Sequence, residues 1–154
     1  MTTIIYLSII LLLIDQISKL LVVKIIDINH PIQIIKNFFY LTYTHNTGAA
    51  FSILTGQRIF LILIGVVILI ILFNYLRKNK VEKKVDKISF SLIIGGALGN
   101  LLDRIVRGYV VDFIDVKIFG YNFPIFNLAD TFIVIGVFLL LITLTRKENK
   151  NDNR

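Results

Sequence analysis

The chain has 154 residues, 56% of them hydrophobic, and a mean hydropathy of +0.79, far above the balance of a soluble protein. The absence of cysteine excludes disulfides, thiol catalysis, thiolate metal sites and self-lipidation. The formal net charge of +7 is also found in nucleic-acid-binding proteins, but here the basic residues gather beside apolar stretches, so we expect no nucleic-acid partner.

Four apolar stretches are long enough to cross a membrane as helices, because a hydrocarbon core about 30 Å thick needs about 20 residues. We predict these spans at residues 4–26, 59–76, 88–105 and 125–145. The spans occupy more than half of the chain, which predicts an all-α polytopic membrane protein. We expect residues 1–154 to form a single integral membrane domain whose last residues, 148–154, are a flexible cytoplasmic tail.

The first stretch differs from a cleaved signal peptide. It lacks a basic segment in front, its apolar run is long, and no small-residue cleavage motif follows. We therefore interpret it as a retained helix.

The first connecting loop has two parts. Residues 37–44 are rich in aromatic and β-branched side chains, which favours a strand, and residues 45–51 combine turn-forming residues, small residues and an aromatic. Two interpretations are open: an interfacial hairpin with an aromatic belt, or a cradle that holds an extended peptide at the membrane surface.

Basic residues concentrate in two segments, residues 77–87 between the second and third spans and residues 146–154 after the fourth. The positive-inside rule places both segments in the cytoplasm. We therefore expect both termini to be cytoplasmic and the loops 27–58 and 106–124 to face outward, in a multi-pass membrane protein.

Three of the spans carry polar side chains near their outer ends. These are Asp15 and Lys19 on the first, Asn100, Asp103 and Arg104 on the third, and Asn127 and Asp130 on the fourth. An isolated charge inside a bilayer is costly, so each of these groups needs a partner or water. Because all of them fall at one depth, they predict a polar site near the outer surface.

Several of these residues also have a purely structural interpretation. Asp15 and Lys19, four residues apart on one helix face, suit an ion pair that fixes the first helix as well as they suit chemistry. Asp103 and Arg104 have the alternative of reaching the headgroups from a helix end, which is what we expect of Asp115 and Lys117.

The segment 95–100, GGALGN, is expected to let helices pack closely rather than to bind phosphate, because it lies inside a span. His30 and His45 lack the spacing of a metal motif. We expect neither a metal nor another cofactor.

Asp112 and Asp130 suit peptide hydrolysis by an activated water molecule. One carboxylate must be ionised to take a proton from the water, the other protonated to polarise the carbonyl, and close proximity enforces that difference. Covalent acyl-enzyme routes lack a nucleophile, since no serine–histidine pair is convincing and cysteine is absent. The alternatives are a small transporter or proton-relay protein using the intramembrane Asp and Lys groups, and a structural membrane subunit.

Five motifs, in this order and spacing, resemble those of lipoprotein signal peptidase (signal peptidase II), the bacterial aspartic intramembrane protease family. They are DQISK at 15–19, NTGAAF at 46–51, GGALGNLLDR at 95–104, VDF at 111–113 and FNLAD at 126–130. The resemblance extends from the first span to the fourth.

The resemblance implies four transmembrane helices, a small extracytoplasmic β-cradle and a short interfacial helical segment. It implies that Asp112 and Asp130 are the catalytic pair, with an active site near the outer leaflet of the bacterial cell membrane. The supporting or substrate-binding positions that it implies are Asp15, Lys19, Asn46, Gly48, Asn100, Arg104, Asn127 and Ala129. The implied partners are diacylglyceryl-modified prolipoproteins, cut before the modified cysteine, and membrane lipid, with no obligate protein partner.

Overall fold

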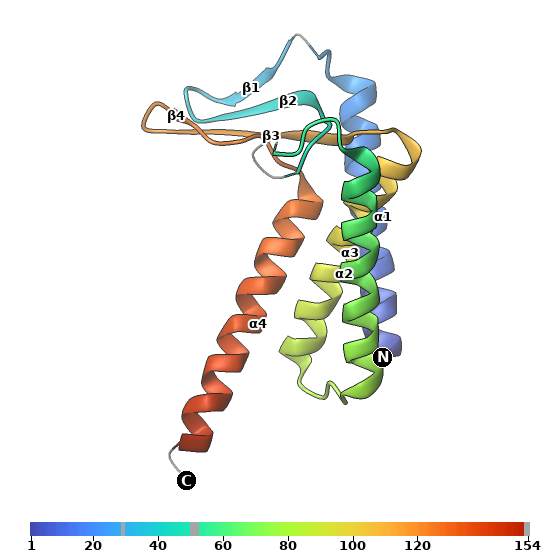
Figure 1. Cartoon of the computed structure of the whole chain (residues 1–154). Coiled ribbons are helices and arrows are strands. Elements are labelled where there is room, and N and C mark those ends of the chain that lie inside the picture. Colours follow the sequence, from blue (N-terminus) through green and yellow to red (C-terminus); the bar gives the residue numbers. More distant parts are fainter. Residues whose placement is uncertain (29, 50–52, 153–154) are drawn as a thin grey trace.

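In the computed structural model, four long helices lie side by side and a small sheet covers one end of them (Figure 1). Residues 1–28, 30–49 and 53–152 are described, with side chains up to residue 145. The helices are α1 (Thr2–Ile25), α2 (Arg58–Lys78), α3 (Lys84–Val106) and α4 (Leu128–Asp152). All four are long and apolar enough to cross a membrane, which confirms the predicted polytopic fold.

The fourth helix departs from the prediction at both ends. It begins at Leu128 rather than near 125, because residues 123–127 continue the outer segment and pair with the sheet through Phe126. It also continues to Asp152, through most of the segment 148–154 that we expected to be a tail. Glu148 and Lys150 in that segment are good helix formers.

The sheet has four antiparallel strands in the order β1 (Ile32–Ile35), β2 (Phe39–Asn46), β3 (Val110–Ile118) and β4 (Tyr121–Asn122). The prediction of β2 is confirmed, and β3 was missed although its sequence, VVDFIDVKI, is rich in β-branched residues. Since β2 and β3 pair, the two outer loops form one layer, and the register sets Thr44 opposite Asp112.

The turns between β2 and α2 contain no additional helix in the parts that are described, residues 47–49 and 53–57. The short interfacial helix implied by the resemblance is therefore not found there. Ala50 and Phe51, which we expected in the same segment, lie outside the described residues.

Helix α3 is the centre of the bundle and packs against α1, α2 and α4. Half of the 18-residue apolar stretch of α3 is buried, compared with 17% of the corresponding stretch of α2. Its glycines explain this position: a Cβ on Gly95 would lie 2.8 Å from the Cβ of Leu11 on α1, and one on Gly96 would overlap the backbone oxygen of Ala129 on α4. The predicted small-residue packing of this segment is confirmed.

The start of α1, the end of α4 and the connection between α2 and α3 lie at the end of the bundle away from the sheet (Figure 1). The molecule therefore has two chemically different ends. The sheet end gathers the outer ends of α1, α3 and α4, where the predicted polar residues are.

Candidate active site

Asp112 lies on β3 with its carboxylate turned toward the helices, and only 3% of the residue is exposed. The side-chain amide of Asn46 donates to its Oδ2 at 2.8 Å, and that of Asn127 donates to its Oδ1 at 2.6 Å. Burial, followed by the negative charge of Asp130, raises the pKa of Asp112 to about 6. Asp112 therefore keeps its proton to a higher pH than an ordinary aspartate does.

Asp130 occupies the third position of α4, where the backbone holds it in place. Its Oδ2 accepts a hydrogen bond from the backbone N–H of Asn127 at 3.2 Å, while its own N–H donates to Oδ1 of Asn127 at 3.0 Å. These reciprocal bonds form a capping box at the start of the helix. The remaining oxygen, Oδ1, accepts from the side-chain amide of Asn100 at 2.7 Å, which ties it to α3.

Asn127 links the two carboxylates, with its buried side chain bonded to Asp112 and its backbone N–H bonded to Asp130. Its amide nitrogen donates both to Asp112 and, at 3.2 Å, to Oδ1 of Asn100, and its oxygen caps α4 next to Asp130. The residue is fully buried, so water does not compete for the hydrogen bonds of its side chain. The orientation of both carboxylates is set by amides whose own positions are fixed.

Lys19 supports this network from α1. Its ammonium group lies 2.9 Å from Asp15, 2.9 Å from Asp103 and 3.0 Å from Oδ1 of Asn100, so all three of its protons are used. The side chains of the three charged residues are 0% exposed. Lys19 is thus structural, and it also orients Asn100, the donor to Asp130. The structural and the functional interpretations of this residue are therefore compatible.

Asp15 connects α1 to the start of α4. Its Oδ1 accepts a hydrogen bond at 3.0 Å from the backbone N–H of Ala129, one of the N–H groups that a helix start leaves without a partner inside the helix. Gly99 on α3 makes room for this carboxylate, since a Cβ there would overlap it. Asp15 therefore helps to place the helix turn that carries Asp130.

Asp103 is not an interfacial residue, and that alternative interpretation is wrong for it. It is 1% exposed, pairs with Lys19, accepts from Arg107 at 3.2 Å, and accepts from the backbone N–H of Val111 at 3.3 Å. Gln16 was missed as well, and it donates to both Asp15 and Asp103 at 3.1 and 3.3 Å. Its spacing of three residues from Lys19 was the available signal.

Arg104 holds the turn that follows β2 against α3. Its guanidinium donates to the backbone oxygen of Gly48 at 2.8 Å and to that of Asn100 at 3.2 Å. Within the turn, the N–H of Gly48 donates to Oδ1 of Asn46 at 2.9 Å, which leaves the amide nitrogen of Asn46 for Asp112. The turn and the carboxylate are therefore coupled through one side chain.

Asp115 and Lys117 lie farther along β3 and take no part in this network. Asp115 accepts from the hydroxyl of Thr42 at 3.3 Å, and the Lys117 ammonium lies 4.4 Å from the centre of the Tyr40 ring. His45 stacks on Tyr109 with ring centres 3.7 Å apart, and His30 pairs with Asp27. Among the described residues, no group of three His, Asp or Glu side chains has a geometry that would hold a metal ion.

The charges around the Asp112–Asp130 pair balance in a specific protonation state. The cations are Lys19, Arg104 and Arg107, and the carboxylates outside the pair are Asp15 and Asp103. With these groups charged, this polar layer is neutral when the pair carries one proton. Neutrality is favoured in a medium of low dielectric constant, so the surroundings favour one ionised and one protonated carboxyl group.

The sequence is similar to those of proteins in one known family. A family model described as Signal peptidase (SPase) II matches residues 7–146. A lipoprotein signal peptidase of Halothermothrix orenii is 48% identical over 143 residues, covering 93% of this chain and 95% of the relative. One of Staphylococcus haemolyticus is 41% identical over 145 residues, covering 94% and 92%.

The fold has solved counterparts too. A bacterial membrane enzyme structure superposes with a TM-score of 0.89 at 37% identity, covering 97% of this chain and 92% of the other. A second bacterial membrane enzyme gives a TM-score of 0.83 at 39% identity, covering 94% and 93%.

Proposed function

The chain belongs to the signal peptidase II family, a family of peptidases that process prolipoprotein signal peptides, and we propose that it is an aspartic endopeptidase acting through Asp112 and Asp130. In this proposal it cleaves bacterial prolipoproteins immediately before the cysteine that carries a diacylglyceryl group. The observation that carries the proposal is the pair of carboxylates joined through Asn127, whose side-chain amide donates to Asp112 and whose backbone N–H donates to Asp130.

The proposed reaction is direct attack by water. One carboxylate, ionised, takes a proton from a water molecule held between the pair, and the other, protonated, donates a hydrogen bond to the scissile carbonyl oxygen. The tetrahedral intermediate then collapses as the amine leaves with a proton. The raised pKa of Asp112 and the charge balance of the layer support the starting state, in which the pair shares one proton.

The turn at Asn46–Ala49 is proposed to lie over the substrate. Asn46 has one amide hydrogen on Asp112 and a weaker contact at 3.4 Å to the backbone oxygen of Ala49. A substrate peptide that displaces the weaker contact to Ala49 would accept a hydrogen bond from Asn46, while Asp112 keeps its own hydrogen bond from the same side chain. The predicted clamp of residues 46–51 would thus also orient Asp112.

The orientation in the membrane follows from the basic end. Six lysines and arginines lie in residues 77–87, at the end opposite the sheet. The positive-inside rule then assigns that end and both termini to the cytoplasmic side of the cell membrane, and the carboxylate pair to the outer leaflet. A lipid-modified cysteine anchored in that leaflet would lie at the depth of the pair.

This orientation is open to a direct test, because the chain has no native cysteine. A membrane-impermeant thiol reagent applied to intact cells is expected to label His30→Cys and to spare Asn79→Cys. Asn29, a neighbouring choice, lies outside the described residues. Labelling of position 79 alone would place the carboxylate pair in the inner leaflet and contradict the proposal.

A proton relay across the membrane is the weaker candidate. Between the polar layer and the basic end, the spans offer no Asp, Glu, Lys, Arg or His for a proton to visit: residues 2–14, 59–76, 88–102 and 131–145 contain none. A relay needs a chain of such groups or of ordered water. We therefore keep hydrolysis as the proposed function.

The decisive experiment presents the purified protein in detergent with two forms of one prolipoprotein, with and without the diacylglyceryl group. We expect cleavage of the lipidated form alone, with the new N-terminus at the modified cysteine, as read by mass spectrometry. Cleavage of both forms would mean that the enzyme does not require the diacylglyceryl group. Cleavage at another bond would contradict the proposed cleavage site.

A further inference from the structure

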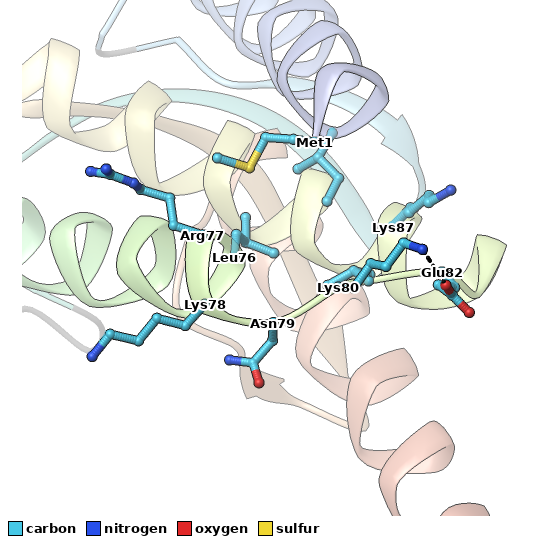
Figure 2. A pocket seen from close by; sticks show the side chains of 10 residues that line it. Met1, Leu76, Arg77, Lys78, Asn79, Lys80, Glu82 and Lys87 are labelled. Atoms are coloured by element: carbon cyan, nitrogen blue, oxygen red, sulfur yellow. Dashed lines mark ion pairs between the residues drawn. The ribbon is translucent and has the colours of Figure 1, made fainter.

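The end of the bundle opposite the sheet contains a cavity of about 620 Å³. It lies between the first residues of α1, the end of α2, and the connection that leads to α3. Figure 2 shows Met1 and Leu76 near its centre, with Arg77 and Lys78 to one side and Lys80 and Lys87 to the other. Its volume is within the range of small-ligand sites, 300 to about 1,000 Å³.

The lining of this cavity has an excess of positive charge. Four of its residues are basic, and the one acidic residue, Glu82, is already paired with Lys80 at 3.1 Å. In the part of the chain that the structure describes, no ion pair engages Arg77, Lys78 or Lys87. The first turn of α1, which begins at the same cavity, contains no acidic residue and has no side-chain cap. An anion would therefore meet three cations without partners and the positive end of a helix dipole.

An apolar crevice of about 50 Å³ continues from the cavity along the bundle. The two share Met1, Ile4 and Leu76, and the crevice then follows α1 and α2 with Ile94 and Leu98 of α3 between them. Ile5 and Ile9, which line it from α1, are 42% and 46% exposed. A charged cavity at the helix ends thus leads into an apolar crevice directed toward the interior of the bilayer.

We propose that this cavity and crevice bind one anionic phospholipid of the adjoining leaflet. The phosphate and headgroup lie at the mouth of the cavity, at the depth where helix ends meet the headgroup layer. Arg77, Lys78 and Lys87, whose charged ends point away from one another in Figure 2, turn toward the phosphate when the lipid binds. The crevice takes only the first methylenes of one acyl chain, and the rest of that chain stays in the bilayer. The proposal does not depend on the peptidase activity, since it concerns the opposite end of the molecule.

The charge part of the proposal has a matched control in the same connection. Lys83 and Lys84 belong to the same basic segment but do not line the cavity. The purified full-length protein in detergent is titrated with phosphatidylglycerol, or with phosphatidylcholine as the neutral comparison, and bound lipid is counted by native mass spectrometry. We expect Arg77→Gln/Lys87→Gln to weaken phosphatidylglycerol binding roughly tenfold, and Lys83→Gln/Lys84→Gln to leave it near the wild-type value.

Two results would overturn the site. Equal weakening in both double variants would mean a diffuse attraction between a charged segment and a charged lipid. Equal binding of phosphatidylglycerol and phosphatidylcholine by the wild-type protein would mean that the cations do not select the headgroup. The first result depends on substitutions, and thermal unfolding in detergent confirms that those variants are folded.

The lipid part is separated from simple anion binding by soluble probes and by the crevice. Inorganic phosphate and glycerol 3-phosphate are expected to leave the thermal midpoint unchanged at concentrations where phosphatidylglycerol raises it. Ile5→Ala is expected to weaken lipid binding roughly threefold, whereas Ile10→Ala, 49% exposed on the same helix and outside the crevice, is expected to have no effect. A full response to glycerol 3-phosphate, or no difference between these two variants, would overturn the assignment of a lipid.

Discussion

The two ends of the bundle contain the same kinds of residue in opposite surroundings. At the sheet end, Lys19 and Asp15 lie 2.9 Å apart with both side chains 0% exposed. At the other end, Lys80 and Glu82 lie 3.1 Å apart with side chains 88% and 71% exposed. The two ion pairs have similar lengths, so the distance between the charges does not distinguish them.

The difference lies in what each charge would lose without its partner. Water solvates Lys80 whether or not Glu82 is near, so the pair adds little to stability. Asp15 and Asp103 have no such alternative, because Lys19 and the amides around them replace the solvent. At the sheet end, burial makes each residue necessary to its neighbours. At the basic end, exposure to water means that substitutions have little effect on folding, although they are expected to affect lipid binding.

The largest contrast is expected for carboxylates. Asp112→Asn and Asp130→Asn are each expected to lower prolipoprotein cleavage roughly 10³-fold or more, because an amide can neither accept the proton of water nor share one with its neighbour. Asp86→Asn, in the first turn of α3 at the basic end, is the matched control and is expected to leave turnover unchanged. Initial rates at equal amounts of folded protein measure this. Substantial turnover by either active-site variant would remove that residue from the catalytic pair.

The second contrast is between lysines. Lys19→Ala leaves Asp15 and Asp103 as buried charges without their common partner, and the expected loss of unfolding free energy is about 3 to 5 kcal/mol. Lys80→Ala is expected to change stability by an amount too small to measure, because its charge is already in water. Thermal unfolding in detergent compares the two. Similar midpoints for both variants would show that the buried ion pairs do not hold α1, α3 and α4 together.

The third contrast is between asparagines. Asn46→Ala removes a donor to Asp112 and the acceptor for the N–H of Gly48, so cleavage is expected to fall about tenfold to a hundredfold. Asn79→Ala removes an exposed side-chain bond to the end of α2 and is expected to leave cleavage unchanged. Turnover and the binding of a peptide-like inhibitor are measured together. An Asn46 variant with unchanged kinetics and inhibition would reduce the segment to a structural turn.

The smallest expected effect is a pH-dependent gain in stability. The pKa of Asp112 is raised from 3.8 to about 6, so between these values the folded state binds a proton that the unfolded state lacks. The stability contributed by this group is therefore present below about pH 4 and is lost as the pH rises through about 6. Asp112→Asn avoids the loss, but its amide accepts from only one of the two asparagine donors. We expect a net gain of about 1 kcal/mol near pH 7.5.

This gain is expected to disappear near pH 4, where the wild-type carboxyl is protonated as well. Glu82→Gln, an exposed carboxylate at the basic end, is the control and is expected to show no such pH-dependent difference. Melting midpoints across this pH range measure both variants. A gain for Asp112→Asn that is the same at both pH values would contradict the raised pKa as its cause.

The sequence by itself was sufficient for the spans, the fold class and the polar layer. Apolar length is a local property, and the thickness of a bilayer converts it directly into helices, so α1 to α4 could be predicted within a few residues. The depth of Asp15, Lys19 and Asp130 followed from their positions along those helices. The five motifs then identified the family, which the comparisons confirm.

The tertiary structure alone decided how these groups pair. Strand β3 forms because it pairs with β2, more than sixty residues away, and that pairing brings Asp112 to Asn46. The burial of Asp103 likewise depends on Lys19 from another helix, so a residue that suits the interface in sequence becomes part of the core. Hydropathy sets the depth of a residue, but the partner that satisfies a buried charge is chosen by long-range packing, which no local pattern contains.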